Sequence, residues 1–136
     1  MRTIIAGSRS LTDPAFIEAA VKASGFVITT VLSGTARGID RLGEAWAKTQ
    51  GLPVELYPAD WEQQGKAAGM LRNRLMVSKA DALIDFIRER VVDQDFHDDR
   101  LAEVLAHLQA DEAAEEIGRT AGGKGALVSR WEKGGE

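Results

Sequence analysis

The chain of 136 residues has no cysteine. This absence excludes a disulfide framework, a thiolate nucleophile and a zinc site with cysteine ligands, and it is compatible with a reducing compartment. We therefore expect a cytoplasmic protein. Positive charge is also scarce, because 17 Lys and Arg residues stand against 21 Asp and Glu residues and leave a net charge of -4. Nucleic-acid binding normally needs a basic face, so we expect no general affinity for nucleic acids.

Long apolar runs are missing as well. No run approaches the length that spans a bilayer, and the apolar residues before Gly7 are too few for a signal peptide, so we expect no contact with a membrane. The acidic cluster around His97 lacks the glycine and the terminal glutamate of a calcium-binding EF-hand loop. We interpret it as a solvated linker and predict neither a metal nor a cofactor. The cluster comprises Asp93, Asp95, His97, Asp98 and Asp99.

The chain alternates apolar runs with amphipathic segments, and its apolar content is enough for one hydrophobic core. Parallel strands need crossover connections, and helices usually supply them. We therefore predict an α/β fold, a Rossmann-like parallel sheet with helices on both faces. The predicted strands are 3–6, 27–32, 53–57 and 82–87, and the predicted helices are 14–24, a second ending before Gly51, and 70–79 with Leu71, Leu75 and Met76 turned inward.

The last third of the chain differs in character. Leu101, Val104, Leu105 and Leu108 recur at helical spacing among many charges, which predicts a C-terminal amphipathic helix. We therefore divide the chain into a nucleotide-binding core (1–90), an acidic linker and amphipathic helix (91–120), and a Gly-rich segment (121–136). The helix is expected to pack on the core or on a partner. The Gly-rich segment shows no clear closing strand, and we expect its last residues to be mobile.

Three strand-to-helix connections place Arg or Lys beside glycine. Each alone is compatible with either an ordinary turn that carries a surface cation or a ligand site. In a parallel sheet, however, the three connections meet at the carboxyl ends of the strands, where helix N-termini attract anions. This convergence predicts an anion-binding site. Its residues are Gly7, Ser8 and Arg9 in the first connection, Ser33, Gly34, Thr35, Arg37, Gly38 and Asp40 in the second, and Lys66, Arg72 and Asn73 in the third.

The runs "IIAGSRSLTD", "SGTARGIDRLGEAWA", "PADWEQQGKAAGMLRNRLM" and "ADALI" resemble the YspA-related branch of the SLOG superfamily. This superfamily groups Rossmann-like proteins related to the Lonely-Guy and Smf/DprA proteins, and many members are prokaryotic or phage-encoded. The resemblance covers roughly residues 1–85 and implies a site for a nucleotide or nucleotide derivative at the carboxyl rim. By motif it assigns to that site Gly7, Ser8, Arg9, Gly34, Arg37, Gly38, Asp40, Arg72 and Asn73.

The chain departs from the family pattern after "ADALI". Family members continue there with a Gly-Gly-x-Gly-Thr phosphate loop, whereas residues 88–121 intervene here before "GGKG". Gly123 and Lys124 belong either to a displaced phosphate loop, and then to the ligand site, or to a flexible tail. Lonely-Guy enzymes place a catalytic glutamate after this loop, and Ser129 stands at the matching position. Hydrolysis would therefore need a substitute carboxylate, for which Asp40, Asp60 and Glu44 are the nearest candidates by motif position. Arg72 matches the arginine of the Lonely-Guy enzymes, so Arg72 and Asp40 are the weak catalytic candidates.

Three functions remain open on these grounds. The leading hypothesis is binding of a small-molecule nucleotide derivative without turnover, by a sensor or sequestering protein. The second is a nucleoside 5'-monophosphate phosphoribohydrolase, which hydrolyses the N-glycosidic bond. The third is a protein-interaction module built on the C-terminal helix. The sequence leaves the oligomeric state open, with a homodimer or a higher homo-oligomer among the alternatives.

Overall fold

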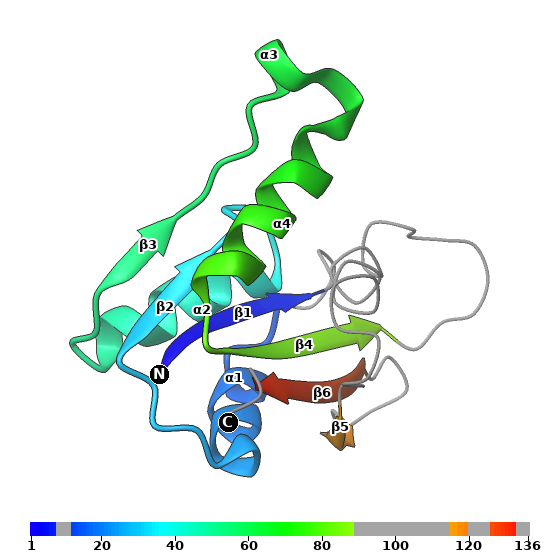
Figure 1. Cartoon of the computed structure of the whole chain (residues 1–136). Coiled ribbons are helices and arrows are strands. Elements are labelled where there is room, and N and C mark those ends of the chain that lie inside the picture. Colours follow the sequence, from blue (N-terminus) through cyan, green and yellow to red (C-terminus); the bar gives the residue numbers. More distant parts are fainter. Residues whose placement is uncertain (8–11, 89–114, 120–125, 133–136) are drawn as a thin grey trace.

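A computed structural model describes residues 1–7, 12–88, 115–119 and 126–132 (Figure 1). A six-stranded sheet has the order β3-β2-β1-β4-β6-β5. The first four strands along the chain run parallel, β4 pairs antiparallel with β6, and β6 pairs antiparallel with β5. The strands are β1 (Arg2–Gly7), β2 (Thr30–Ser33), β3 (Val54–Leu56), β4 (Ala82–Arg88), β5 (Glu115–Arg119) and β6 (Ala126–Glu132).

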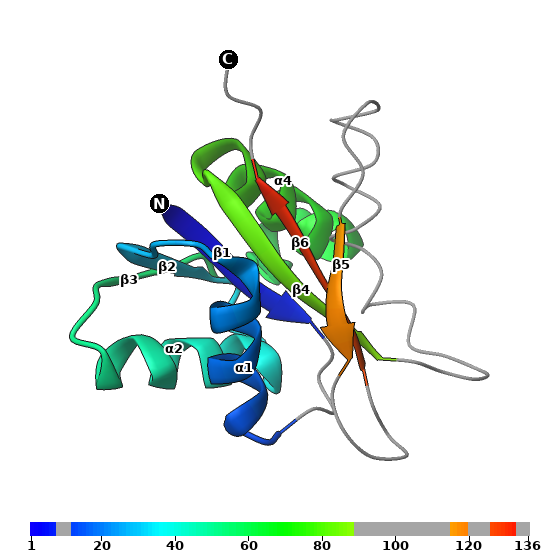
Figure 2. The same cartoon turned by 90° about the horizontal axis from the view of Figure 1, so that it is seen from below.

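Helices cover both faces of this sheet, which confirms the predicted Rossmann-like α/β class. Helices α1 (Ala15–Ser24) and α2 (Ile39–Thr49) lie on one face, and α4 (Ala68–Lys79) lies on the other (Figure 2). Side chains of β1 alternate between the faces: Ile5 joins the cluster under α1 and α2, whereas Ile4 joins the cluster under α4. Within the described parts of the chain, no helix is long and apolar enough to cross a membrane.

The connection from β3 to α4 differs from the prediction. Residues expected in a loop form the short helix α3 (Trp61–Gln64) and the 3₁₀ turn η1 (Gly65–Ala67), and α4 begins at Ala68. The Asp60 carboxylate accepts a hydrogen bond from the Gln63 amide at 3.2 Å and caps α3. Neither α3 nor η1 buries a residue, so no apolar periodicity marks them in the sequence.

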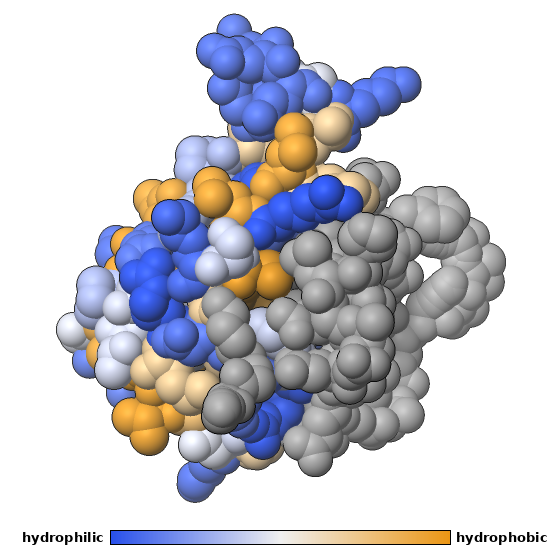
Figure 3. Space-filling model, in the orientation of Figure 1, coloured by the Kyte–Doolittle hydropathy of each residue, from blue (hydrophilic) through white to orange (hydrophobic). Residues whose placement is uncertain are grey.

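The orientation predicted for α4 is correct only for Met76. Met76 is buried, but Leu71 and Leu75 are 42% and 48% exposed, and Figure 3 shows apolar surface along α4. The helix carries apolar side chains around much of its circumference, so spacing alone does not identify the buried face.

The second strand is shorter than predicted. Residues 27–32 were expected to form it, yet β2 begins at Thr30. Val27 is 74% exposed, and its carbonyl accepts a hydrogen bond from the N-terminal amino group at 2.7 Å. Phe26 and Ile28 are buried in the core from a connecting segment, so this apolar run reflects core packing rather than strand pairing.

The C-terminal part contains two strands that the sequence analysis missed. Strand β6 (126–132) lies where no closing strand was expected, and β5 (115–119) lies in the segment for which we predicted a helix. The run "ALVSRW" has strand composition, but it is short and lies between glycines, so the sequence pattern did not predict a strand there. The leucines that predicted the amphipathic helix and the acidic cluster around His97 lie outside the described residues, and the division into segments remains a prediction.

An ion-pair cluster crosses β2 and joins β1 to β3. The Arg2 guanidinium donates to both carboxylate oxygens of Glu55, at 2.5 and 2.7 Å, and the Tyr57 hydroxyl donates to the same carboxylate at 2.8 Å. The hydrogen bonds from Arg2 and then Tyr57 lower the pKa of Glu55 from its ordinary value of 4.5. The cluster therefore stabilises the folded chain most when Glu55 is ionised.

Replacing Glu55 with glutamine should lower the free energy of unfolding at pH 7 by less than about 1 kcal/mol, because the pair is partly exposed. A lowered folded-state pKa contributes stability above pH 4.5, and this contribution disappears as the pH falls through the lowered value. The difference between wild type and Glu55→Gln, measured by urea denaturation, should therefore shrink at pH 3. Glu62→Gln, on the exposed α3, is the control; equal pH profiles for all three proteins would contradict the prediction.

Candidate functional site

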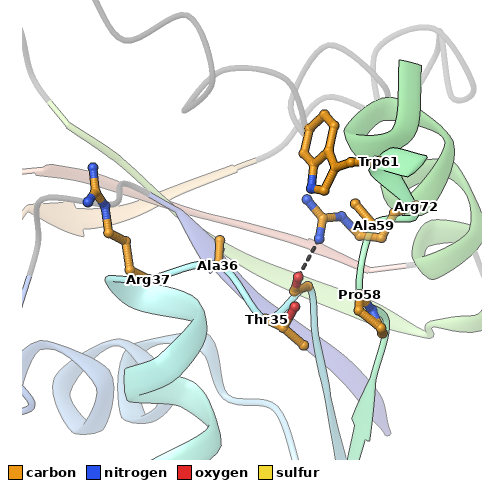
Figure 4. Close-up of a pocket in the computed structure, with 8 residues that line it drawn as sticks. Thr35, Ala36, Arg37, Pro58, Ala59, Trp61 and Arg72 are labelled. Carbon is orange, nitrogen blue, oxygen red and sulfur yellow. Dashed lines mark hydrogen bonds between the residues drawn. The ribbon is translucent and has the colours of Figure 1, made fainter. Parts of the chain in front are cut away.

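A pocket of about 290 Å³ opens at the carboxyl rim of the sheet, where β2 and β3 end and α4 begins. The loops after β2 and β3 and the helices α3 and α4 build its wall (Figure 4). Such crevices beyond the carboxyl ends of parallel strands are the usual ligand sites of this architecture. The lining residues are Gly34, Thr35, Ala36, Arg37, Pro58, Ala59, Trp61 and Arg72.

Two buried side chains hold the loop that follows β2. The Ser33 hydroxyl accepts a hydrogen bond from the Thr35 amide at 3.0 Å and donates to the Glu44 carboxylate at 2.5 Å. The Asp40 carboxylate, only 6% exposed, accepts from the Ala36 amide at 3.1 Å. Thr35 has a φ of 65°, which is uncommon for a β-branched residue and needs such support. The structure thus gives Asp40 and Ser33 a role in shaping the loop.

Arg72 joins this loop to the one after β3. Its Nη1 donates to the carbonyl of Gly34 and, at 3.3 Å, to the carbonyl of Tyr57. Its Nε donates to the Asn73 side-chain oxygen at 2.8 Å, which orients the guanidinium. One cation therefore fixes the two loops to α4 and forms part of the pocket wall.

Arg37 differs from Arg72 in its bonding. It is exposed, lies just before α2 and lines the pocket, and no hydrogen bond or ion pair joins it to another described residue. Figure 4 shows it across the opening from Trp61 and Arg72. No side chain caps the N-terminus of α2. An unpaired guanidinium beside an open helix N-terminus favours a bound anion.

The structure brings together part of the predicted site. Gly34, Thr35, Arg37 and Arg72 line the pocket, and Ser33, Asp40 and Asn73 support these residues from behind. Gly38 begins α2 without lining the pocket, Gly7 packs against Phe86 at the end of β1, and Lys66 is exposed on η1. Ser8, Arg9, Gly123 and Lys124 lie outside the described residues. No group of three or more potential metal ligands occurs in the parts of the chain that the structure describes.

From the sequence, Trp61 was either a core residue or a residue near the pocket whose aromatic face stacks on a base, and the structure places it in the pocket wall. Pro58 and Ala59 were not singled out, because neither side chain carries a charge or a polar group. Sequence reasoning also did not single out Asp85, which is 3% exposed in the middle of β4 and does not line the pocket. The signal was present, since an aspartate interrupts the apolar run "ALIDFI". In the sheet register Asp85 pairs with Ser129 of the antiparallel strand β6.

Comparison with known proteins supports the resemblance described from the motifs. Residues 1–64 match the model of the YspA, cpYpsA-related SLOG family, which confirms the predicted relationship for the part that holds the first two glycine loops. The Gene 61 protein of Mycobacterium phage D29 is 45% identical over 62 residues, which cover 41% of this chain and 50% of the phage protein. The chain thus matches about half the length of that curated relative. No solved structure matches the chain significantly.

Proposed function

We propose that this chain, whose residues 1–64 match the YspA, cpYpsA-related SLOG family, binds a nucleotide or nucleotide-derived anion in the pocket at the carboxyl rim. Its role would be that of a sensor or sequestering protein. The observation that carries the proposal is Arg37, a cation that lines the pocket and is bonded to no other described residue. A guanidinium in this position binds phosphate oxygens with two parallel hydrogen bonds.

The loop after β2 is organised before a ligand arrives. Asp40 and Ser33 hold the loop amides, and Arg72 holds the loop carbonyl of Gly34, so little conformational entropy is lost on binding. A volume of about 290 Å³ lies at the small end of ligand sites and suits a mononucleotide or one half of a larger derivative.

Binding is favoured over hydrolysis by the chemistry of the lining. None of the described residues that line the pocket carries a carboxylate. Cleavage of an N-glycosidic bond builds positive charge on the ribose, and a nearby carboxylate normally stabilises that charge or activates water. Asp40, a weak catalytic candidate from the sequence, uses an oxygen to accept from the Ala36 amide, which supports a structural role.

The first test is a thermal-shift and calorimetric titration with AMP, ADP-ribose and cyclic nucleotides. At least one ligand should raise the melting temperature, and Arg37→Ala should weaken its binding about tenfold, because one charge-assisted contact is lost. Arg74→Ala, an exposed arginine of α4 outside the lining, is the matched control and should bind as wild type does. Chromatography of the incubated nucleotides should show no free base. The absence of any shift at millimolar concentration would contradict the proposal.

A further inference from the structure

We propose that residues 58–67 form a flap that carries Trp61 onto the aromatic base of the bound ligand, which makes the site selective for nucleotides over sugar phosphates. This inference rests on the proposed function and adds that the site recognises the base of the ligand. Trp61 lines the pocket, yet 55% of its surface is exposed. A large aromatic face left open at a pocket wall is suited to stacking on a planar ring.

The flap is fixed at both ends. At its start, the Tyr57 amide donates to the Ser33 carbonyl at 2.8 Å, the Tyr57 carbonyl accepts from Arg72, and the Tyr57 hydroxyl binds Glu55. At its end, Ala68 is fully buried and begins α4. The residues that limit the flap are therefore held by the sheet and by α4.

Between these ends the chain is weakly held. Nine of its ten residues are exposed, Ala59 being half-buried, and neither α3 nor η1 contributes to the core. Figure 1 shows α3 beyond the end of α4 and away from the sheet, and Figure 3 shows a hydrophilic surface there. A segment with so few buried apolar contacts opens and closes at low cost. Movement of this segment carries Trp61 with it, while Arg72 and the loop after β2 stay in place.

Arg37 and Trp61 recognise different parts of the ligand, the anion and the base. Arg37 stands on the other side of the opening, so a ligand whose anion binds Arg37 directs its remaining part across the pocket towards Trp61 (Figure 4). Stacking accepts any base, because every base has a planar face, but gives nothing to a sugar phosphate that lacks an aromatic ring. Trp61 should therefore determine selectivity for the presence of a base rather than for its identity.

The experiment compares AMP with ribose 5-phosphate by calorimetry, in wild type, Trp61→Ala and Trp61→Phe. Trp61→Ala should weaken AMP binding about tenfold and leave ribose 5-phosphate unchanged, whereas Trp61→Phe should keep most of the AMP affinity. Leu75→Ala, which truncates another exposed apolar side chain outside the pocket, is the control for surface effects.

Hydrogen exchange reports on the flap itself. Amides of 60–67 should exchange faster than those of α4 in the free protein and should slow down when AMP is added. If AMP binds but Trp61→Ala weakens AMP and ribose 5-phosphate equally, or weakens neither, the flap proposal is wrong while nucleotide binding stands. The same conclusion follows if exchange in 60–67 is already as slow as in α4. If wild type binds none of AMP, ADP-ribose, the cyclic nucleotides and ribose 5-phosphate, both proposals fail.

Discussion

Replacing Gly34 with alanine is expected to lower the free energy of unfolding by about 2 kcal/mol and to weaken nucleotide binding more than tenfold. A Cβ atom at this position would lie 2.9 Å from Arg72 Nη1 and 2.9 Å from an Asp40 carboxylate oxygen. Neither side chain moves without cost, because Arg72 binds two loop carbonyls and Asp40 accepts from the Ala36 amide. The methyl group therefore breaks the contacts that shape the pocket.

Urea denaturation and nucleotide titration of Gly34→Ala measure the two effects separately. Gly69→Ala is the matched control for stability, because a Cβ there meets nothing closer than 3.4 Å and the residue lies within α4. Alanine in a helix is favoured over glycine, so this control should be at least as stable as wild type. Unchanged stability and affinity in Gly34→Ala would show that Arg72 and Asp40 do not fix the loop.

The parts of the fold that were predicted correctly depend on local pattern. The units from Arg2 to Thr49 combine apolar runs, helical spacing and glycine breaks within short stretches, and the structure has them in the same order. The α/β class follows from that alternation. The loop "SGTARG" was likewise visible, because glycine and arginine mark it where a strand ends.

The parts that were missed depend on contacts between distant residues. Strand β6 pairs with β4 across a long separation in sequence, and its short run carries no signal of its own for that partner. In the sequence, Arg72 is one of several cations near glycine. Its structural role is to donate hydrogen bonds to the Gly34 and Tyr57 carbonyls, which lie together beside α4 only in the folded chain. The difference between Arg37 and Arg72, and the place of Trp61, are consequences of that tertiary arrangement.

A substitution of Gly7 is expected to have the largest effect on stability. Gly7→Ala should cost about 3–5 kcal/mol, which approaches the whole stability of a domain of this size. A Cβ at Gly7 would lie 2.4 Å from the Phe86 carbonyl oxygen, 2.7 Å from its Cβ and 2.8 Å from its nitrogen. Backbone atoms of a central strand cannot move away from the added Cβ atom, whereas the end of a flexible side chain can. The φ of 154° at Gly7 adds a further cost for any residue with a side chain.

Circular dichroism and urea denaturation should show Gly7→Ala to be largely unfolded or strongly destabilised at 25 °C. Ala6→Gly, at the neighbouring position of β1, is the control and should cost about 1 kcal/mol, because it removes one buried methyl group without a collision. Gly7 closes β1 against Phe86 and does not line the pocket. A stable Gly7→Ala variant with weaker nucleotide binding would instead assign Gly7 to the ligand, as the motif alone suggests, and would contradict the packing explanation.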